Sequence, residues 1–311
     1  MSVPSNTFKT YEAVGIREDL SDVVTNISPI DNPFYRACSN SPEKPKHIKH
    51  EFLTDVLAAA GSNAQIEGDD RTASAVSAAT RLYNIMQIQS KTFRLSDTTE
   101  KVVAAGKVTS LSYQSAKSSK ELTKDIEYAF LRGVRADGSA SVARQMRGAL
   151  NWIITNLDKA ADATLNAYGT VTGGTARAIT KVILDGVLQN IFVSGGNPKI
   201  AYCGPFQKRQ ISALITSGNY RSIIEDKKLE AVVDVYEGDF SIIAFKSHRN
   251  MPTDVLVVLD MDYWKKATLR PSSRRPLAKT GDSEIYDITV EHTLEASAET
   301  ASGRITNLTT S

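Results

Sequence analysis

The chain has 311 residues, of which 41% are hydrophobic, and a formal net charge of +2 from 37 basic and 35 acidic side chains. This length suits about two domains with a sizeable core. A charge this close to zero argues against a dedicated nucleic-acid-binding protein, because such domains carry a marked basic excess. No apolar run opens the chain or approaches the ~20 residues that span a bilayer, so we expect neither a signal peptide nor a membrane segment.

The first 97 residues predict an extended arm followed by a projecting hairpin. Five prolines interrupt residues 1–45, which leaves room for one short helix in an otherwise extended N-terminal arm. Segments 46–57 and 81–95 alternate apolar and polar side chains, which predicts two strands. The 23 residues between them are small and polar, and such a hairpin is marginal in water. We therefore predict an extended loop that packs on another molecule; the alternative is a mobile surface hairpin.

The longest predicted element is a helix over Ser110–Arg132, which no Pro or Gly interrupts before Gly133. Its apolar stripe is narrow, so it resembles a rod against which other segments pack rather than a core helix. Its charged flank, which includes Glu127, is expected to face away from the core. The predicted packing positions are Leu111, Leu122, Ile126 and Phe130.

Helices and strands alternate in the rest of the chain. A clean apolar stripe predicts a second, core-facing helix over 142–157. Residues 161–275 mix helices and strands and predict a compact α+β domain, whereas the two prolines of 269–281 predict a loop. A long final strand is predicted over 284–296.

Patterns for catalysis, cofactors or metal ions are weak. His47 and His50 are three residues apart on a predicted strand, which places their side chains on opposite faces. Cys38 and Cys203 match no metal-binding or redox spacing. We therefore predict no catalytic, cofactor or metal site. A soluble enzyme or ligand-binding protein stays the less favoured alternative, because it would have no use for the long hairpin.

Opposite charges gather in two distant segments. The hairpin tip is acidic, whereas 265–279 is basic and contains no acidic residue. One interpretation is two unrelated solvated loops. The other is contact between the tip of one subunit and the basic loop of the next, through Glu67, Asp69, Asp70, Arg270, Arg274 and Arg275. Exposed ion pairs contribute about 0–1 kcal/mol each, so these contacts would determine register more than strength.

The order of arm, hairpin, long helix, second helix, α+β domain and last strand resembles that of tailed-bacteriophage major capsid proteins with the Hong-Kong-97-like fold. Short stretches are similar to the SU10-type branch of these proteins. No single stretch is specific, but the ordered set is, and it runs from end to end except in 161–255. The stretches are YEAVG at 11–15, EDL at 18–20, NISP at 26–29, NPF at 32–34, EGDD at 67–70, YQ at 113–114, EL at 121–122, DIE at 125–127, Trp152, TN at 155–156, PLAKTGD at 276–282 and EHTLE at 291–295.

The resemblance implies an α+β fold and a division of the chain. The expected parts are an N-terminal arm (1–45), an extended loop (46–97), a peripheral domain (98–160) with its spine helix (110–132), an axial domain (161–275), and a return to the peripheral domain with a long C-terminal strand (276–311).

The implied function is structural. We expect hexamers and pentamers that form an icosahedral phage head around double-stranded DNA, with the DNA contacted non-specifically, and assembly in the host cytoplasm. The portal and separate scaffolding and decoration proteins are possible partners. The shell of an encapsulin-like nanocompartment is the alternative of the same fold.

Two departures from the prototype of this fold carry expectations. No lysine lies between Val56 and Arg81, so a Lys–Asn cross-link through the extended loop is not expected. The arm begins at residue 1, so we expect scaffolding to come from a separate protein or to be unnecessary.

Overall fold

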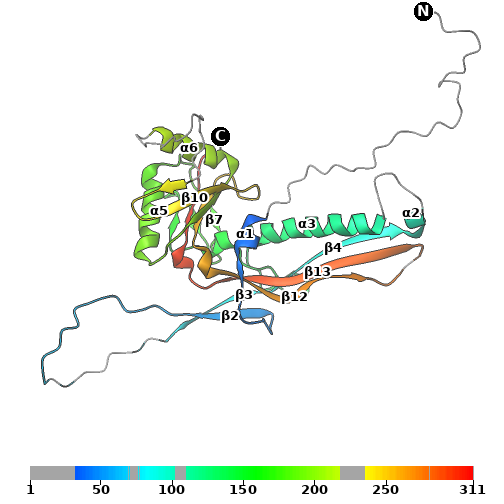
Figure 1. The fold of residues 1–311 in the computed structure, drawn as a ribbon, viewed down its shortest axis with the longest axis horizontal. Helices are drawn as coiled ribbons and strands as arrows, with labels where there is room; N and C mark the ends of the chain where they lie inside the picture. Colours follow the sequence, from blue (N-terminus) through cyan, green and yellow to red (C-terminus); the bar gives the residue numbers. More distant parts are fainter. Residues whose placement is uncertain are drawn as a thin grey trace, which may run out of the picture.

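The computed structural model describes residues 32–68, 70, 76, 78–101, 110–217, 235–279 and 281–310. Most of the predicted N-terminal arm therefore lies outside the described residues, as does Asp69 of the hairpin tip. Figure 1 shows a long helix, α3, lying along an elongated sheet, with a compact lobe at one end and a hairpin that projects beyond it. The helix has the predicted bounds, Ser110–Arg132.

The elongated sheet has four strands in the order β1-β12-β13-β4. Its two long central strands are antiparallel, and β4 pairs with β13 over ten positions from His292–Gln87 to Ser283–Ser96. The strand bounds are Ser39–Asn40 for β1, Gln87–Ser96 for β4, Trp264–Pro276 for β12 and Ser283–Ala296 for β13.

The lobe contains a six-stranded sheet in the order β5-β14-β11-β8-β10-β9. Two 13-residue helices, α5 (Lys181–Val193) and α6 (Pro205–Ser217), accompany it (Figure 1). A Cβ on Gly303 would lie 2.5 Å from Val187, so a glycine lets α5 approach β14 closely. The strands are β5 (Leu157–Asp158), β8 (Ile200–Cys203), β9 (Val235–Glu237), β10 (Ile242–Ser247), β11 (Leu256–Leu259) and β14 (Gly303–Ile305).

The hairpin consists of β2 (Lys49–Thr54) and β3 (Thr80–Ile85), which pair antiparallel from Lys49–Ile85 to Thr54–Thr80. The chain between the two strands is irregular wherever it is described. A second small ribbon pairs β6 (Thr164–Leu165) with β7 (Val171–Thr172), and α2 (Asp97–Lys101) follows β4.

Two hydrophobic clusters fill the molecule. One lies between α3, the elongated sheet and the short helices α1 (Pro33–Ala37) and α4 (Ala149–Trp152), with Phe34, Phe130 and Trp264 fully buried in it. The other packs α5 against the six-stranded sheet through Leu184, Val187, Leu188 and Ile191. On α3, Leu122, Ile126 and Phe130 are buried and Leu111 is half-buried.

The predicted helix over 142–157 is wrong, because only Ala149–Trp152 is helical. The preceding residues turn back along the end of α3 instead. Ala136 and Gln145 exchange backbone hydrogen bonds, and Gly148 donates to the carbonyl of Gly133 at 2.9 Å. These contacts satisfy the backbone groups that a helix would have paired internally.

The predicted loop over 269–281 is also wrong in its first half, where β12 continues to Pro276. Its register shifts twice, between Thr268 and Arg270 and between Arg270 and Ser273. Pro271 lies inside the second irregularity and Pro276 at the end of the strand, two places where a strand tolerates proline.

The sheets also divide the chain differently from the predicted parts. The segment predicted as one long hairpin arm, 81–95, is split at Met86, because β3 pairs with β2 whereas β4 joins the elongated sheet. The extended loop therefore ends near residue 86 rather than at 97. Strand β12 belongs with β13 rather than with the lobe, and the C-terminal β14 returns to the lobe rather than to the elongated sheet.

Candidate assembly surfaces and the junction that positions them

A buried carboxylate lies where the arm, the spine helix and the lobe meet. Glu127, on α3, is fully buried, which corrects the expectation that it faces outward. One oxygen accepts a hydrogen bond from the backbone N–H of Phe34 at 2.9 Å and the other from that of Tyr35 at 2.8 Å. The side chain of Asn32 makes no capping bond to α1, so Glu127 takes the role of the N-cap for that short helix.

The same carboxylate binds the lobe. His248, which follows β10, places Nε2 2.7 Å from Oε1 of Glu127. The edge of the Tyr202 ring packs on the imidazole, with the centroids 5.7 Å apart. Burial, reinforced by the charge of Glu127, raises the pKa of Tyr202 to about 12. Three segments distant in sequence are therefore joined at one group whose loss would leave several polar partners buried and unpaired.

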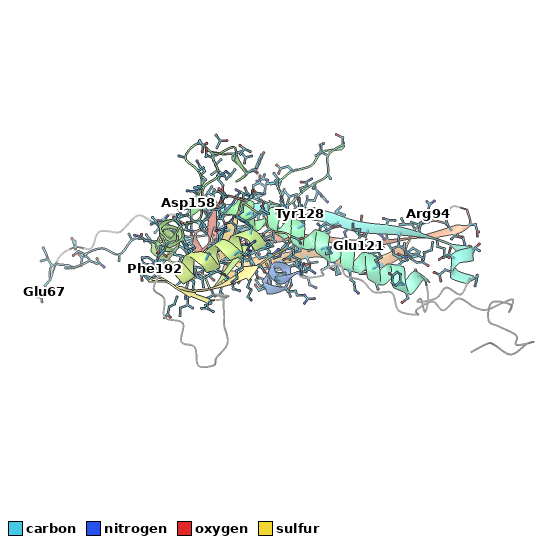
Figure 2. The ribbon with its side chains drawn as sticks, turned by 90° about the horizontal axis from the view of Figure 1, so that it is seen from above. Glu67, Arg94, Glu121, Tyr128, Asp158 and Phe192 are labelled. Carbon is cyan, nitrogen blue, oxygen red and sulfur yellow. The ribbon has the colours of Figure 1, made fainter. Side chains whose placement is uncertain are left out.

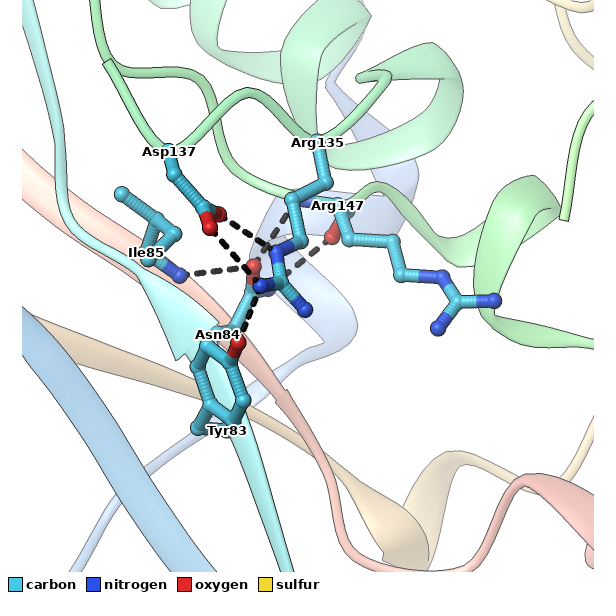
Figure 3. A network of polar contacts seen from close by, with 6 residues as sticks. All are labelled: Tyr83, Asn84, Ile85, Arg135, Asp137 and Arg147. Carbon is cyan, nitrogen blue, oxygen red and sulfur yellow. Dashed lines mark hydrogen bonds and ion pairs between the residues drawn. The ribbon is translucent and has the colours of Figure 1, made fainter. Parts of the chain in front are cut away.

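A second polar cluster anchors the root of the hairpin (Figure 3). The side-chain amide of Asn84 donates to the carbonyl of Arg147 at 3.0 Å and to that of Leu294 at 2.7 Å. Its oxygen accepts from the backbone N–H of Ile85 and of Arg147. Arg135 lies over the ring of Tyr83 in the same cluster. The end of β3 is thus bound to the rest of the subunit.

His50 and Glu295 add a buried ion-pair contact at this root, with Nε2 2.9 Å from Oε2. Burial opposes ionisation of Glu295, but hydrogen bonds from His50, Ser41 and Ser297 outweigh it and lower its pKa to about 2. The root of the hairpin therefore keeps a charged carboxylate over the whole range above that value.

His292, on β13, is fully buried between the rings of Tyr35 and Phe130, and its Nε2 lies 2.9 Å from Oε1 of Gln89. Burial lowers its pKa to about 4, since the charged imidazolium would lose its hydration there. The neutral ring is therefore part of the packed sheet.

From Leu53 of β2 outward, the hairpin exposes apolar side chains that its own chain does not cover. They are Leu53, Val56, Leu57, Ile66 and Val76, and each is at least 68% exposed. Glu67 and Asp70 are exposed at the tip. Figure 2 labels Glu67 at one end of the molecule and Arg94 of β4 near the other, so the tip lies far from the elongated sheet of its own subunit.

The predicted basic residues lie on β12 and have acidic neighbours on β13. Arg270 binds Glu291 at 2.7 Å, and Arg275 lies 3.7 Å from Asp287. Arg274 donates to the hydroxyl of Ser115 on α3 at 3.2 Å. The basic segment is therefore a strand up to Pro276 rather than a loop, and the adjacent strand supplies acidic partners to Arg270 and Arg275. Within one subunit the structure does not bring these arginines to the acidic tip.

The described part of the chain holds no group of three side chains suited to bind a metal ion. His47 and His50 have separate partners, since the first accepts from the backbone of Lys49 and the second contacts Glu295. Cys38 and Cys203 are free and buried. No described helix has both the length and the apolar character to cross a membrane.

A family model described as SU10 major capsid protein matches residues 3–309. The chain belongs to this family. It is therefore a phage capsid protein, whose family has a structural role. The major capsid protein of Escherichia phage Phieco32 is 25% identical to it over 341 residues, with 95% of each chain covered.

Solved structures confirm the predicted Hong-Kong-97-like α+β fold of this SU10 family member. The capsid asymmetric unit of cyanophage A-1(L) is similar with a TM-score of 0.64 and 13% identity, covering 97% of this chain and 99% of that one. The holo-SrpI encapsulin complex from Synechococcus elongatus PCC 7942 is similar with a TM-score of 0.60 and 10% identity, covering 94% of each chain.

Sequence reasoning missed Glu127, His248 and Asn84 as positioning residues. Glu127 lies beside Ile126 at the edge of the narrow stripe and has charged neighbours on the helix, so nothing in the spacing distinguishes it from Asp125. His248 is isolated in sequence, and its partner is 121 residues away.

Glu127→Gln should lower the free energy of unfolding by about 3 kcal/mol, because it replaces one oxygen of a buried carboxylate by an amide group that cannot accept, which leaves a buried partner without an acceptor. Urea denaturation of soluble subunits measures this loss. Asp125→Asn is the matched control, since Asp125 makes an exposed ion pair with Lys91 and should cost at most about 1 kcal/mol. Equal losses in the two variants would contradict the role of Glu127.

His292 should make the subunit less stable in mild acid. Its pKa in the folded state is below its usual value, so its contribution is complete above about pH 6.5 and is lost as the pH falls towards 4. Between pH 7 and pH 5 this loss is about 2 kcal/mol. In His292→Phe the difference in unfolding free energy between these two pH values should shrink by that amount. Denaturant unfolding at both values measures it, and an unchanged difference would contradict the assignment.

Proposed function

We propose that this phage capsid protein assembles with copies of itself into hexamers and pentamers that close an icosahedral head around double-stranded DNA. The observation that carries the proposal is the hairpin, whose exposed aliphatic side chains extend far beyond the core of their own subunit. Such a surface gains stability only when another molecule removes it from water.

The architecture supports a separate role in the shell for each part of the subunit. Helix α3 and the elongated sheet would form the wall of the shell, the lobe with α5 and α6 would lie around the centres of the hexamers and pentamers, and the hairpin would reach over a neighbouring subunit. The net charge of +2 suits a lining that confines DNA without binding it tightly, because affinity for DNA rises with the number of neutralised phosphates. Assembly would take place in the host cytoplasm, with the portal and any scaffolding or decoration proteins as partners.

An encapsulin-like shell is the second candidate, because an encapsulin shares the fold over 94% of this chain. The family match over residues 3–309 supports the phage head instead. The two candidates differ in contents, since a phage head encloses a genome whereas a nanocompartment encloses proteins.

Purified protein should form large closed particles, and particles from infected cells should contain nuclease-resistant DNA. Size-exclusion chromatography followed by negative-stain microscopy measures the first property, and extraction of nucleic acid after nuclease treatment measures the second. A monomer or dimer under all assembly conditions would argue against any shell. Closed particles that hold protein cargo and no DNA would favour the nanocompartment.

We further propose that the acidic tip of one subunit contacts Arg274 and Arg275 of a neighbour. Both arginines are exposed, and Arg275 lies 3.7 Å from Asp287, a looser contact than the 2.7 Å between Arg270 and the buried Glu291. Changing both Arg274 and Arg275 to Glu should lower the yield of particles, because it places like charges opposite Glu67 and Asp70.

The same reversal also removes contacts inside the subunit, so a charge swap distinguishes the two effects. Adding Glu67→Lys and Asp70→Lys should restore much of the particle yield, as counted by electron microscopy, if the tip and the arginines meet between subunits. An unchanged yield in the arginine variant, or no recovery in the swap, would count against the contact.

A further inference from the structure

A groove of about 600 Å³ lies between the root of the hairpin and the turn at 137–144. Its apolar lining comes from three different segments: Ile48 next to β2, Ile88 on β4 and Val142 on the turn, which are 44%, 47% and 55% exposed. Its charged lining consists of Lys49, of Arg144, which also binds Glu291, and of Asp137, which is paired with Arg135. Three partly exposed aliphatic side chains in one concave site form an apolar surface whose exposure to water is unfavourable.

The walls of this groove are formed by hydrogen bonds and ion pairs within the subunit. Ser139 and Val142 close the turn with a backbone hydrogen bond of 2.9 Å, and Asp137 is paired with Arg135. On the opposite side, β2 is paired with β3, and β4 is paired with β13. A site already held in shape costs little ordering when a partner binds.

We propose that this groove receives the hairpin of a neighbouring copy of the chain, through the aliphatic side chains at 53–57. This inference rests on the proposed shell and identifies where the hairpin of one subunit lies on the next. Leu53, Val56 and Leu57 are 68%, 84% and 94% exposed, and Asp55 lies among them. An aliphatic cluster with one carboxylate matches an apolar groove bordered by Lys49 and Arg144.

The hairpin does not fill the groove of its own subunit. Ile48 and Leu53 are five residues apart along one extended segment, about 17 Å at the rise of a β-strand. The hairpin runs outward from this root, as the position of Glu67 in Figure 2 shows. The occupant is therefore the same segment of a different copy.

The groove also continues towards Arg275, one of the arginines that we assign to the acidic tip. Arg144 of the groove and Arg270 of β12 bind the two oxygens of Glu291, at 3.0 and 2.7 Å. Glu291 is opposite Ile88 in the sheet, and four positions further along β13, on the same face, Asp287 is opposite Arg275. That step is about 13 Å along the strand.

The reach of the hairpin fits this path. Ten residues separate Leu57 from Glu67, and an extended chain of that length spans up to about 35 Å. A hairpin with its aliphatic residues in the groove can therefore place its tip at Arg275. One continuous track on the neighbour accommodates both the apolar and the acidic parts of the hairpin.

Cysteine pairs test the proposal in assembled particles. Val56→Cys combined with Val142→Cys should give a ladder of covalent oligomers on a non-reducing denaturing gel after mild oxidation. The native Cys38 and Cys203 are buried and are not expected to react. A disulfide inside one subunit would leave the monomer band in place, so the gel separates contacts within a chain from contacts between chains. Leu57→Cys with Ile88→Cys is a second pair for the same groove.

The matched control is Val56→Cys with Val182→Cys, because Val182 is 81% exposed on α5 and lies outside the groove. The groove pairs should give about tenfold more cross-linked subunit than this control, since a disulfide needs Cα atoms within about 7 Å. Particles that assemble normally by negative stain but give no ladder with either groove pair, or no more than the control, would overturn the groove assignment alone. Failure of the unmodified chain to assemble would instead overturn the proposed shell.

Discussion

The arrangement of the subunit depends on the buried carboxylate of Glu127. A lone carboxylate in an apolar interior is costly, so it persists only where partners satisfy it. Here two backbone N–H groups of α1 and the imidazole of His248 do so. The same contacts join the arm and the lobe to the C-terminal part of α3. The orientation of the lobe relative to the elongated sheet is therefore coupled to one side chain on the spine helix.

The packing of α3 against its neighbours explains why its apolar stripe is narrow. The second half of the helix is buried on several sides, by the sheet, by α1 and by α4, and Leu122, Ile126 and Phe130 lie in that cluster. Its first half lies along β4, where Ser118 is buried and Leu111 is half-buried. A helix that packs on one edge of a long sheet needs a narrow stripe, and small residues allow a close approach.

Stability is distributed unevenly over the molecule. The two hydrophobic clusters and the polar cluster around Asn84 hold the body and the hairpin root. Beyond Thr54 the hairpin has neither a sheet partner nor a core in its own chain over its described residues, and its aliphatic side chains face water. In the proposed shell a neighbour would cover these side chains, and this burial would link the fold to assembly. The rigid root then determines the direction in which the hairpin projects.

The amino-acid sequence determined the elements whose signal is local. The spine helix at Ser110–Arg132 and the last strand follow from periodicity and from the absence of helix breakers, and the exposed hairpin follows from its lack of apolar mass. Only the tertiary structure decided the features that depend on distant partners. The chain after Gly138 returns along α3 because Gln145 and Gly148 form backbone hydrogen bonds with Ala136 and Gly133. Strand β12 continues through Pro271 because it is paired with β13. Glu127 is buried because α1 and His248 contact it there. In each case the residues that determine the structure are distant in sequence or form a pairing that periodicity does not encode. The local sequence pattern therefore could not predict these features.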